Sequence, residues 1–85
     1  MSLRLRAEVS ATDTKYGAVL LDERSGDYWK LNPTGALILL RLLAGDDPAQ
    51  AAAALVAEYE VDEARALLDV TALLDELRSA RLVMS

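Results

Sequence analysis

The sequence predicts an α+β domain of winged-helix-like architecture, in which a three-stranded antiparallel sheet is followed by three helices. Two observations support this fold class. Patterns typical of strands occupy the first 31 residues, and helix-start signals recur through the rest of the chain. Because 85 residues supply material for one hydrophobic core, we expect residues 1–85 to form a single domain.

Three segments carry the strand patterns. Residues 3–9 alternate apolar and charged side chains, as a half-buried strand does, whereas residues 10–15 are polar and typical of a turn. Residues 16–21 end in a continuous apolar run, which indicates the central strand of the sheet. A polar connection that ends in Gly26 predicts a hairpin turn, and the β-prone residues 28–31 form the last strand.

Helix-start signals follow the strands. Asn32 and Asp47 are each followed by proline, a pair of residues that caps and begins a helix. The first helix is expected from residue 33 to about residue 44, and the second from residue 48 to residue 59. Asp62 caps a third helix that continues to about residue 80.

The third helix carries two neighbouring stripes at three- and four-residue spacing. One stripe is wholly apolar and is expected to face the core; it consists of Leu67, Val70, Leu74 and Leu77. The other, rotated by one residue, combines a large apolar side chain with two acids; it consists of Ala66, Asp69, Leu73, Glu76 and Ala80. A mixed stripe next to the core predicts the wall of a groove.

The composition argues against an enzyme. Cysteine and histidine are absent, which removes disulfides, thiol nucleophiles, imidazole bases and the usual ligands of zinc, copper and haem. The carboxylates are scattered through turns and helix surfaces, and no phosphate-binding glycine motif occurs. We therefore expect a binding domain with no catalytic residue, no metal and no cofactor.

Charge and hydropathy limit the partners. The net charge of −5 arises entirely from residues 32–85, which carry nine acids and four arginines, so a nucleic-acid backbone would be repelled there. The longest apolar stretch, residues 35–40, is far shorter than the ~20 residues that cross a bilayer. The chain shows no secretion signal at its start, and we expect a cytoplasmic protein that binds neither membrane nor nucleic acid.

The last strand lies at an edge of the expected sheet, where its backbone can accept another extended chain. Trp29 and Leu31 share one face of this strand, and Tyr28 and Lys30 share the other. The opposite edge alternates with arginines, which discourage pairing. The last strand is therefore the better acceptor.

If the third helix lies beside this edge, side chains of the added strand would enter a slot lined by Val70, Leu73 and Leu77. Two other interpretations stay open. Trp29 and the apolar stripe can serve core packing alone. A free edge can also pair with the same edge of a second copy, so we expect a monomer or a weak homodimer.

Two segments carry a family resemblance: GDYWKLNPTGA at residues 26–36 and LDVTALLDEL at residues 68–77. With them the chain resembles PqqD-like proteins along nearly its whole length, and most of all the stand-alone RiPP recognition elements of lasso peptide biosynthesis. The resemblance implies a winged-helix-like domain to which the leader of a ribosomally made precursor peptide adds as a strand. The leader-binding positions that it implies are Tyr28, Trp29, Lys30, Leu31, Asp69, Val70, Leu73, Glu76 and Leu77.

The same resemblance implies a non-catalytic adaptor. Such a protein delivers the precursor to a separate leader peptidase, and the leader also serves a cyclase that closes the ring. The chain ends at Ser85, soon after the third helix, so we expect it to act in trans. Two alternatives remain: a PqqD-like chaperone that delivers a precursor to a radical enzyme, and a winged-helix nucleic-acid-binding regulator, whose recognition helix should however be basic.

Overall fold

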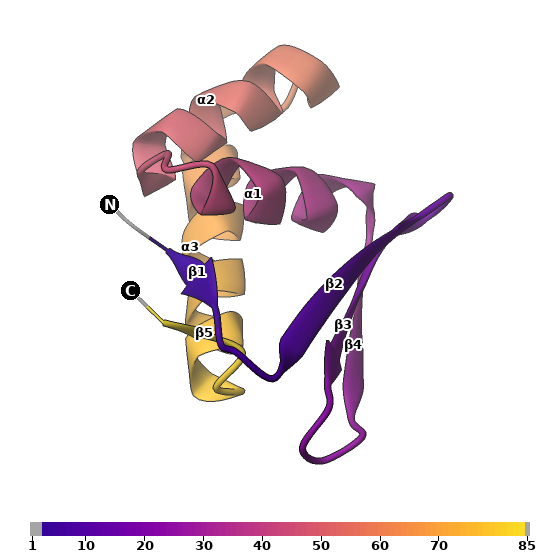
Figure 1. Cartoon of the computed structure of the whole chain (residues 1–85). Helices are drawn as coiled ribbons and strands as arrows, with labels where there is room; N and C mark the ends of the chain where they lie inside the picture. The colour runs from indigo at the N-terminus through magenta and orange to yellow at the C-terminus, as the bar shows by residue number, and fades with distance from the viewer. Residues whose placement is uncertain (1–2, 85) are drawn as a thin grey trace.

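A three-stranded antiparallel meander with three helices on one side of it makes up most of the fold (Figure 1), in a computed structural model that describes residues 3–84. The strands are β2 (Val9–Thr14), β3 (Gly17–Asp22) and β4 (Tyr28–Leu31), with β3 in the centre. The helices are α1 (Pro33–Leu43), α2 (Pro48–Tyr59) and α3 (Glu63–Ser79). The α+β, winged-helix-like class predicted from the sequence is confirmed.

A second, two-stranded sheet joins the two ends of the described chain. β1 (Arg4–Leu5) pairs antiparallel with β5 (Val83–Met84). The backbone N–H of Arg6 also donates a hydrogen bond to the carbonyl of Leu82 (3.0 Å), which extends the contact by one step. The C-terminal end of α3 is thereby attached to the start of the chain.

The predicted placement of the first strand is wrong. Residues 3–9 alternate because Leu3 and Val9 both enter the core, on either side of a turn in which the N–H of Val9 bonds to the carbonyl of Arg6 (3.0 Å). The segment expected to be a turn, residues 10–15, instead forms most of β2. Its side chains are polar because β2 is an edge strand on which every residue after Val9 is exposed.

Side-chain caps fix where the helices begin. The Oδ1 atom of Asn32 accepts a hydrogen bond from the N–H of Gly35, and that of Asp47 accepts one from the N–H of Gln50, both at 2.8 Å. Asp62 caps α3 in the same way. Because Asn32 comes directly after β4, α1 begins where this strand ends, and the first turn of α1 lies next to the sheet edge.

The core is aliphatic, and α3 forms one side of it. Val70, Leu74 and Leu77 are buried as predicted, but Leu67 is 43% exposed. The fourth core position of the stripe belongs to Ala66, which is completely buried. A small side chain at this position lets α3 pack closely on α2, its principal neighbour.

The hairpin turn between β3 and β4 is held by Asp22, whose side chain is buried. Its carboxylate accepts hydrogen bonds from the backbone N–H of Arg24 (3.0 Å) and from the Arg24 guanidinium (3.3 Å). The guanidinium contact is the main reason that the pKa of Asp22 lies below its ordinary value of 3.8. The carboxylate stays ionised at neutral pH and stabilises the turn that leads into β4.

Gly17, at the start of β3, is expected to resist substitution. Its φ is +140°, and an added Cβ would lie 1.9 Å from the carbonyl oxygen of Leu31. Gly17→Ala should therefore lower the free energy of unfolding by about 3 kcal/mol or more, measured by urea denaturation. Gly26→Ala is the matched control, because Gly26 also has a positive φ (+79°) but nothing within 4 Å of an added Cβ. Its cost should be about 1–2 kcal/mol, and equal losses in the two variants would contradict the steric argument.

Candidate functional site

The outer edge of β4 is open, since no strand within residues 3–84 pairs with it. The N–H of Asp22 bonds to the carbonyl of Asp27 (2.9 Å), which fixes the alternation of hydrogen bonds between β3 and β4. By this alternation, every second residue of β4 directs its N–H and C=O groups away from the sheet. These residues are Tyr28 and Lys30, and their backbone groups are available to an added strand.

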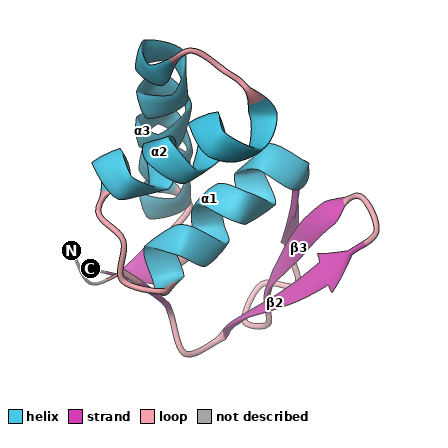
Figure 2. Cartoon of the chain, turned by 90° about the horizontal axis from the view of Figure 1, so that it is seen from above, coloured by secondary structure: helices cyan, strands magenta, loops and turns pink. Residues whose placement is uncertain are grey.

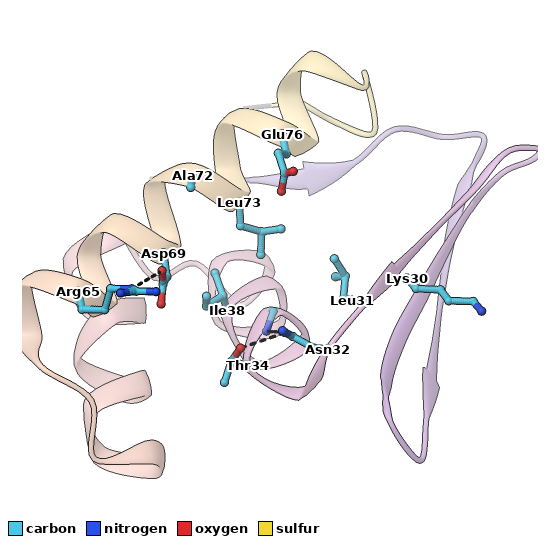
Figure 3. Close-up of a pocket in the computed structure, with 11 residues that line it drawn as sticks. Lys30, Leu31, Asn32, Thr34, Ile38, Arg65, Asp69, Ala72, Leu73 and Glu76 are labelled. Atoms are coloured by element: carbon cyan, nitrogen blue, oxygen red, sulfur yellow. Dashed lines mark hydrogen bonds and ion pairs between the residues drawn. The ribbon is translucent and has the colours of Figure 1, made fainter.

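A groove separates this edge from α3 (Figure 3). α3 packs on α2 and α1 and does not lie tightly against β4. The intervening space forms two neighbouring hollows of about 420 and 540 Å³. Both hollows are lined by Lys30, Leu31, Leu73 and Glu76, so they belong to one surface, which we call the edge groove.

The two hollows lie at different ends of the edge groove. The first is lined by Arg65 and Asp69 from the N-terminal half of α3, together with the first turn of α1. The second is lined by Trp29, by the C-terminal end of α3 and by Leu82. The start of β4 thus lies near the end of α3, and the two elements run in opposite directions along the groove.

The floor of the edge groove is apolar. Trp29, Leu31 and Leu73 are partly buried and pack against the hydrophobic core, while Leu77 is 2% exposed and closes the floor beneath them. Leu31 and Leu73 point into the space between β4 and α3 from its two walls (Figure 3). This surface can bury apolar side chains of a guest, each Å² removed from water contributing about 25 cal/mol.

Charged side chains line the α3 wall of the groove. The guanidinium of Arg65 and the carboxylate of Asp69 form an exposed ion pair, with 3.3 Å between Nε and Oδ1. Glu76 lines both hollows, and its carboxylate has no hydrogen-bond or ion-pair partner among residues 3–84. Lys30 belongs to the opposite wall, but its side chain points away from the groove (Figure 3).

Most residues that the sequence singled out come together here. Two do not line the groove. Val70 is completely buried in the core stripe of α3, so its side chain offers no surface to a guest. The side chain of Tyr28 is 61% exposed and lies on the other face of the sheet, so only its backbone faces the guest. The predicted residues that line the groove are Trp29, Leu31, Asp69, Leu73, Glu76 and Leu77, together with Lys30, whose side chain points away from it.

The N-cap and the first two turns of α1 also line the groove, and the sequence did not predict this. Asn32, Thr34, Gly35 and Ile38 contribute to the first hollow. The Asn-Pro start signal indicates this position in principle, because a helix that begins directly after an edge strand must begin beside its end. No local pattern indicates Leu82, which reaches the second hollow from the segment between α3 and β5.

An open strand edge, a groove beside it and a helix as the far wall define a class of small domains that bind a peptide by completing their own sheet. The chain belongs to the family described as coenzyme PQQ synthesis protein D (PqqD), which matches residues 17–83. The family resemblance seen in the sequence is thereby confirmed.

Two solved structures are similar to the chain along its whole length. "Lasso peptide synthetase B1 complexed with the leader peptide" is 47% identical, with a TM-score of 0.91 and 100% of both chains covered. "TbiB1 in Complex with the TbiA(beta) Leader Peptide" is 27% identical, with a TM-score of 0.85, covering 100% of this chain and 96% of that one. No curated protein matches the chain. Both of these structural relatives are complexes with a leader peptide.

No helix among residues 3–84 is long and apolar enough to cross a membrane. Nor do three or more acidic side chains there come together in a way that could hold a metal ion.

Proposed function

We propose that this protein binds the leader region of a ribosomally made precursor peptide and delivers it to the enzymes of a lasso peptide pathway. The observation that carries the proposal is the unpaired edge of β4 beside the edge groove. The two structural relatives support it, because each is in complex with a leader peptide and one is 47% identical over the full length.

The leader adds to β4 as a further strand. Its backbone bonds to the outward groups of Tyr28 and Lys30, each hydrogen bond contributing about 1 kcal/mol net. Because side chains alternate between the faces of a strand, every second leader residue enters the edge groove and contacts Leu31 and Leu73. Backbone bonds do not read sequence, so the side chains in the groove supply the specificity.

The protein acts as a non-catalytic adaptor. To deliver the bound leader to an enzyme, it requires a second surface that stays free when the leader is bound. We assign this role to the face of the sheet that lies away from the helices (Figure 2). On this face Leu21 (37% exposed) lies opposite Tyr28 (61% exposed), and Val19 is partly exposed nearby. A bound leader would extend this face beyond Tyr28, so a leader peptidase docked on it would meet protein and peptide together. The cyclase would receive the same leader-bound complex.

The second candidate is a PqqD-like chaperone that delivers a precursor to a radical enzyme, and the family description favours it. Such a chaperone would use the same edge and the same groove. The 47% identity with lasso peptide synthetase B1 favours the lasso pathway. Binding of a duplex finds no support in the charges, because α3 carries four acids and two arginines.

The groove assignment predicts the effect of a charge at Leu73. Leu73→Asp should weaken leader binding by more than about tenfold while the fold survives, because a carboxylate would enter an apolar slot that the guest closes to water. Leu68→Asp is the control, since Leu68 lies on the same helix but is 65% exposed and lines neither hollow. Titration of a synthetic leader by calorimetry measures both, and an unchanged affinity for Leu73→Asp would count against the edge groove.

Strand addition predicts that the N–H of Lys30 is needed for binding. Lys30→Pro removes an outward donor without removing a bond to β3, and should weaken leader binding about tenfold. Ala11→Pro is the control: Ala11 lies opposite Leu20, whose backbone groups face β4, so Ala11 directs its own groups outward at the other edge. If both proline variants bound the leader equally well, addition at β4 would be excluded.

If the sheet face around Leu21 and Tyr28 is the delivery surface, a substitution on it should impair delivery of the leader without impairing leader binding. Leu21→Glu should leave leader affinity unchanged but slow cleavage of the precursor by the pathway's leader peptidase at least about fivefold, because a charge would enter the apolar contact. Leu40→Glu serves as the control, since Leu40 is 64% exposed on α1. Cleavage followed by mass spectrometry at fixed peptidase concentration tests this, and equal rates would remove the assignment.

A further inference from the structure

We propose that Glu76 selects leaders that carry a basic side chain two residues beyond the apolar side chain seated over Leu73. This inference rests on the proposed function, since it describes how the same groove chooses its guest. It follows from the charges and the spacing of three side chains on the α3 wall, Asp69, Leu73 and Glu76.

Glu76 is an uncompensated charge that lines both hollows of the edge groove, whereas Asp75, which also has no partner among residues 3–84, lines the second hollow alone. The Glu76 side chain points into the groove (Figure 3) and has no partner among the residues the structure describes, while Lys30 of the facing wall points away. An added strand would displace water from this carboxylate, and a carboxylate that loses water without gaining a partner raises the free energy of the complex. A guest that places a cation at Glu76 is therefore favoured over one that places an apolar or acidic side chain there.

Asp69, at the other end of the α3 wall, does not require a cation from the guest. It is paired with Arg65 one helical turn earlier, at 3.3 Å, and the pair has no net charge. A guest strand can lie beside this ion pair without supplying a charged side chain. The selection for charge is thus confined to the Glu76 end of the groove.

The order of contacts follows from the direction of the strands. Since β4 and α3 run in opposite directions, a guest antiparallel to β4, the more common and slightly more stable arrangement, runs in the same direction as α3. From its N-terminus such a guest passes Asp69, then Leu73, then Glu76.

The distances set the spacing. Leu73 and Glu76 are three positions apart on α3, a rise of roughly 4.5 Å. Guest side chains on one face repeat every ~6.6 Å, so the next groove-facing side chain after the one over Leu73 lies just beyond Glu76. A lysine or arginine there can reach back to the carboxylate, which leans toward the N-terminus of its helix. The pattern read by the groove is therefore apolar, any residue, basic.

The test uses a synthetic leader from the precursor encoded beside this chain's gene. The leader residue seated over Leu73 is found first, as the apolar position whose alanine replacement couples to Leu73→Ala in a double-mutant cycle. All basic residues of the leader are then replaced by glutamine, and a single lysine is reintroduced at each position in turn. Affinities are measured at low and high salt for the wild type, for Glu76→Gln and for Glu58→Gln. Glu58 is the matched control, an exposed glutamate on α2 away from the groove.

The expected result is a gain of about three- to tenfold at one position, two residues after the apolar anchor, that shrinks with added salt. The gain should vanish in Glu76→Gln and persist in Glu58→Gln. A glutamate at the same leader position should bind better to Glu76→Lys than to the wild type.

Other outcomes overturn different claims. If the wild type binds the leader but Glu76→Gln retains the full gain, or if the charge swap has no effect, the selection by Glu76 is wrong and leader binding stands. If the gain appears at the adjacent position, on the other face of the strand, the register is wrong and the inference falls with it. If the wild type does not bind the leader at all, the proposed function itself falls.

Discussion

The backbone groups of Tyr28 and Lys30 that face away from the sheet must find hydrogen-bond partners, and water serves them until a guest arrives. The rest of the structure keeps this edge open. α3 packs mainly on α2, and its C-terminal end is held by the pairing of β5 with β1. The edge groove, with its apolar floor, therefore stays open between the helix and the strand.

An open edge is also a hazard, because it can pair with the same edge of another copy. β4 limits this hazard by its shortness, since it has four residues, and by the lysine at its third position. The acidic wall beside it adds a second limit, because α3 of one copy would repel α3 of another across a shared edge. Of these features, the acidic wall discourages self-pairing without discouraging a basic guest.

Local patterns were enough to predict the fold class and one wall of the site. Leu73 and Glu76 could be placed on a groove wall because their stripe lies one residue from the buried stripe of the same helix. The alternation of apolar and charged residues at 3–9 led to a wrong strand placement, because two core contacts on either side of a turn imitate the pattern of a strand. Most of the polar residues 10–15 form an edge strand, which needs no apolar face. Leu82 could not be predicted, since it depends on pairing between the two ends of the chain.

The β1–β5 pairing also decides how the domain can be connected to others. It brings the two ends of the described chain to one corner of the molecule (Figure 1), next to the end of the groove that Trp29 and Leu82 line. A guest antiparallel to β4 would leave the groove at this same corner, with its downstream portion emerging there. An enzyme tethered to either end would therefore meet the emerging segment at high effective concentration, even on a short linker.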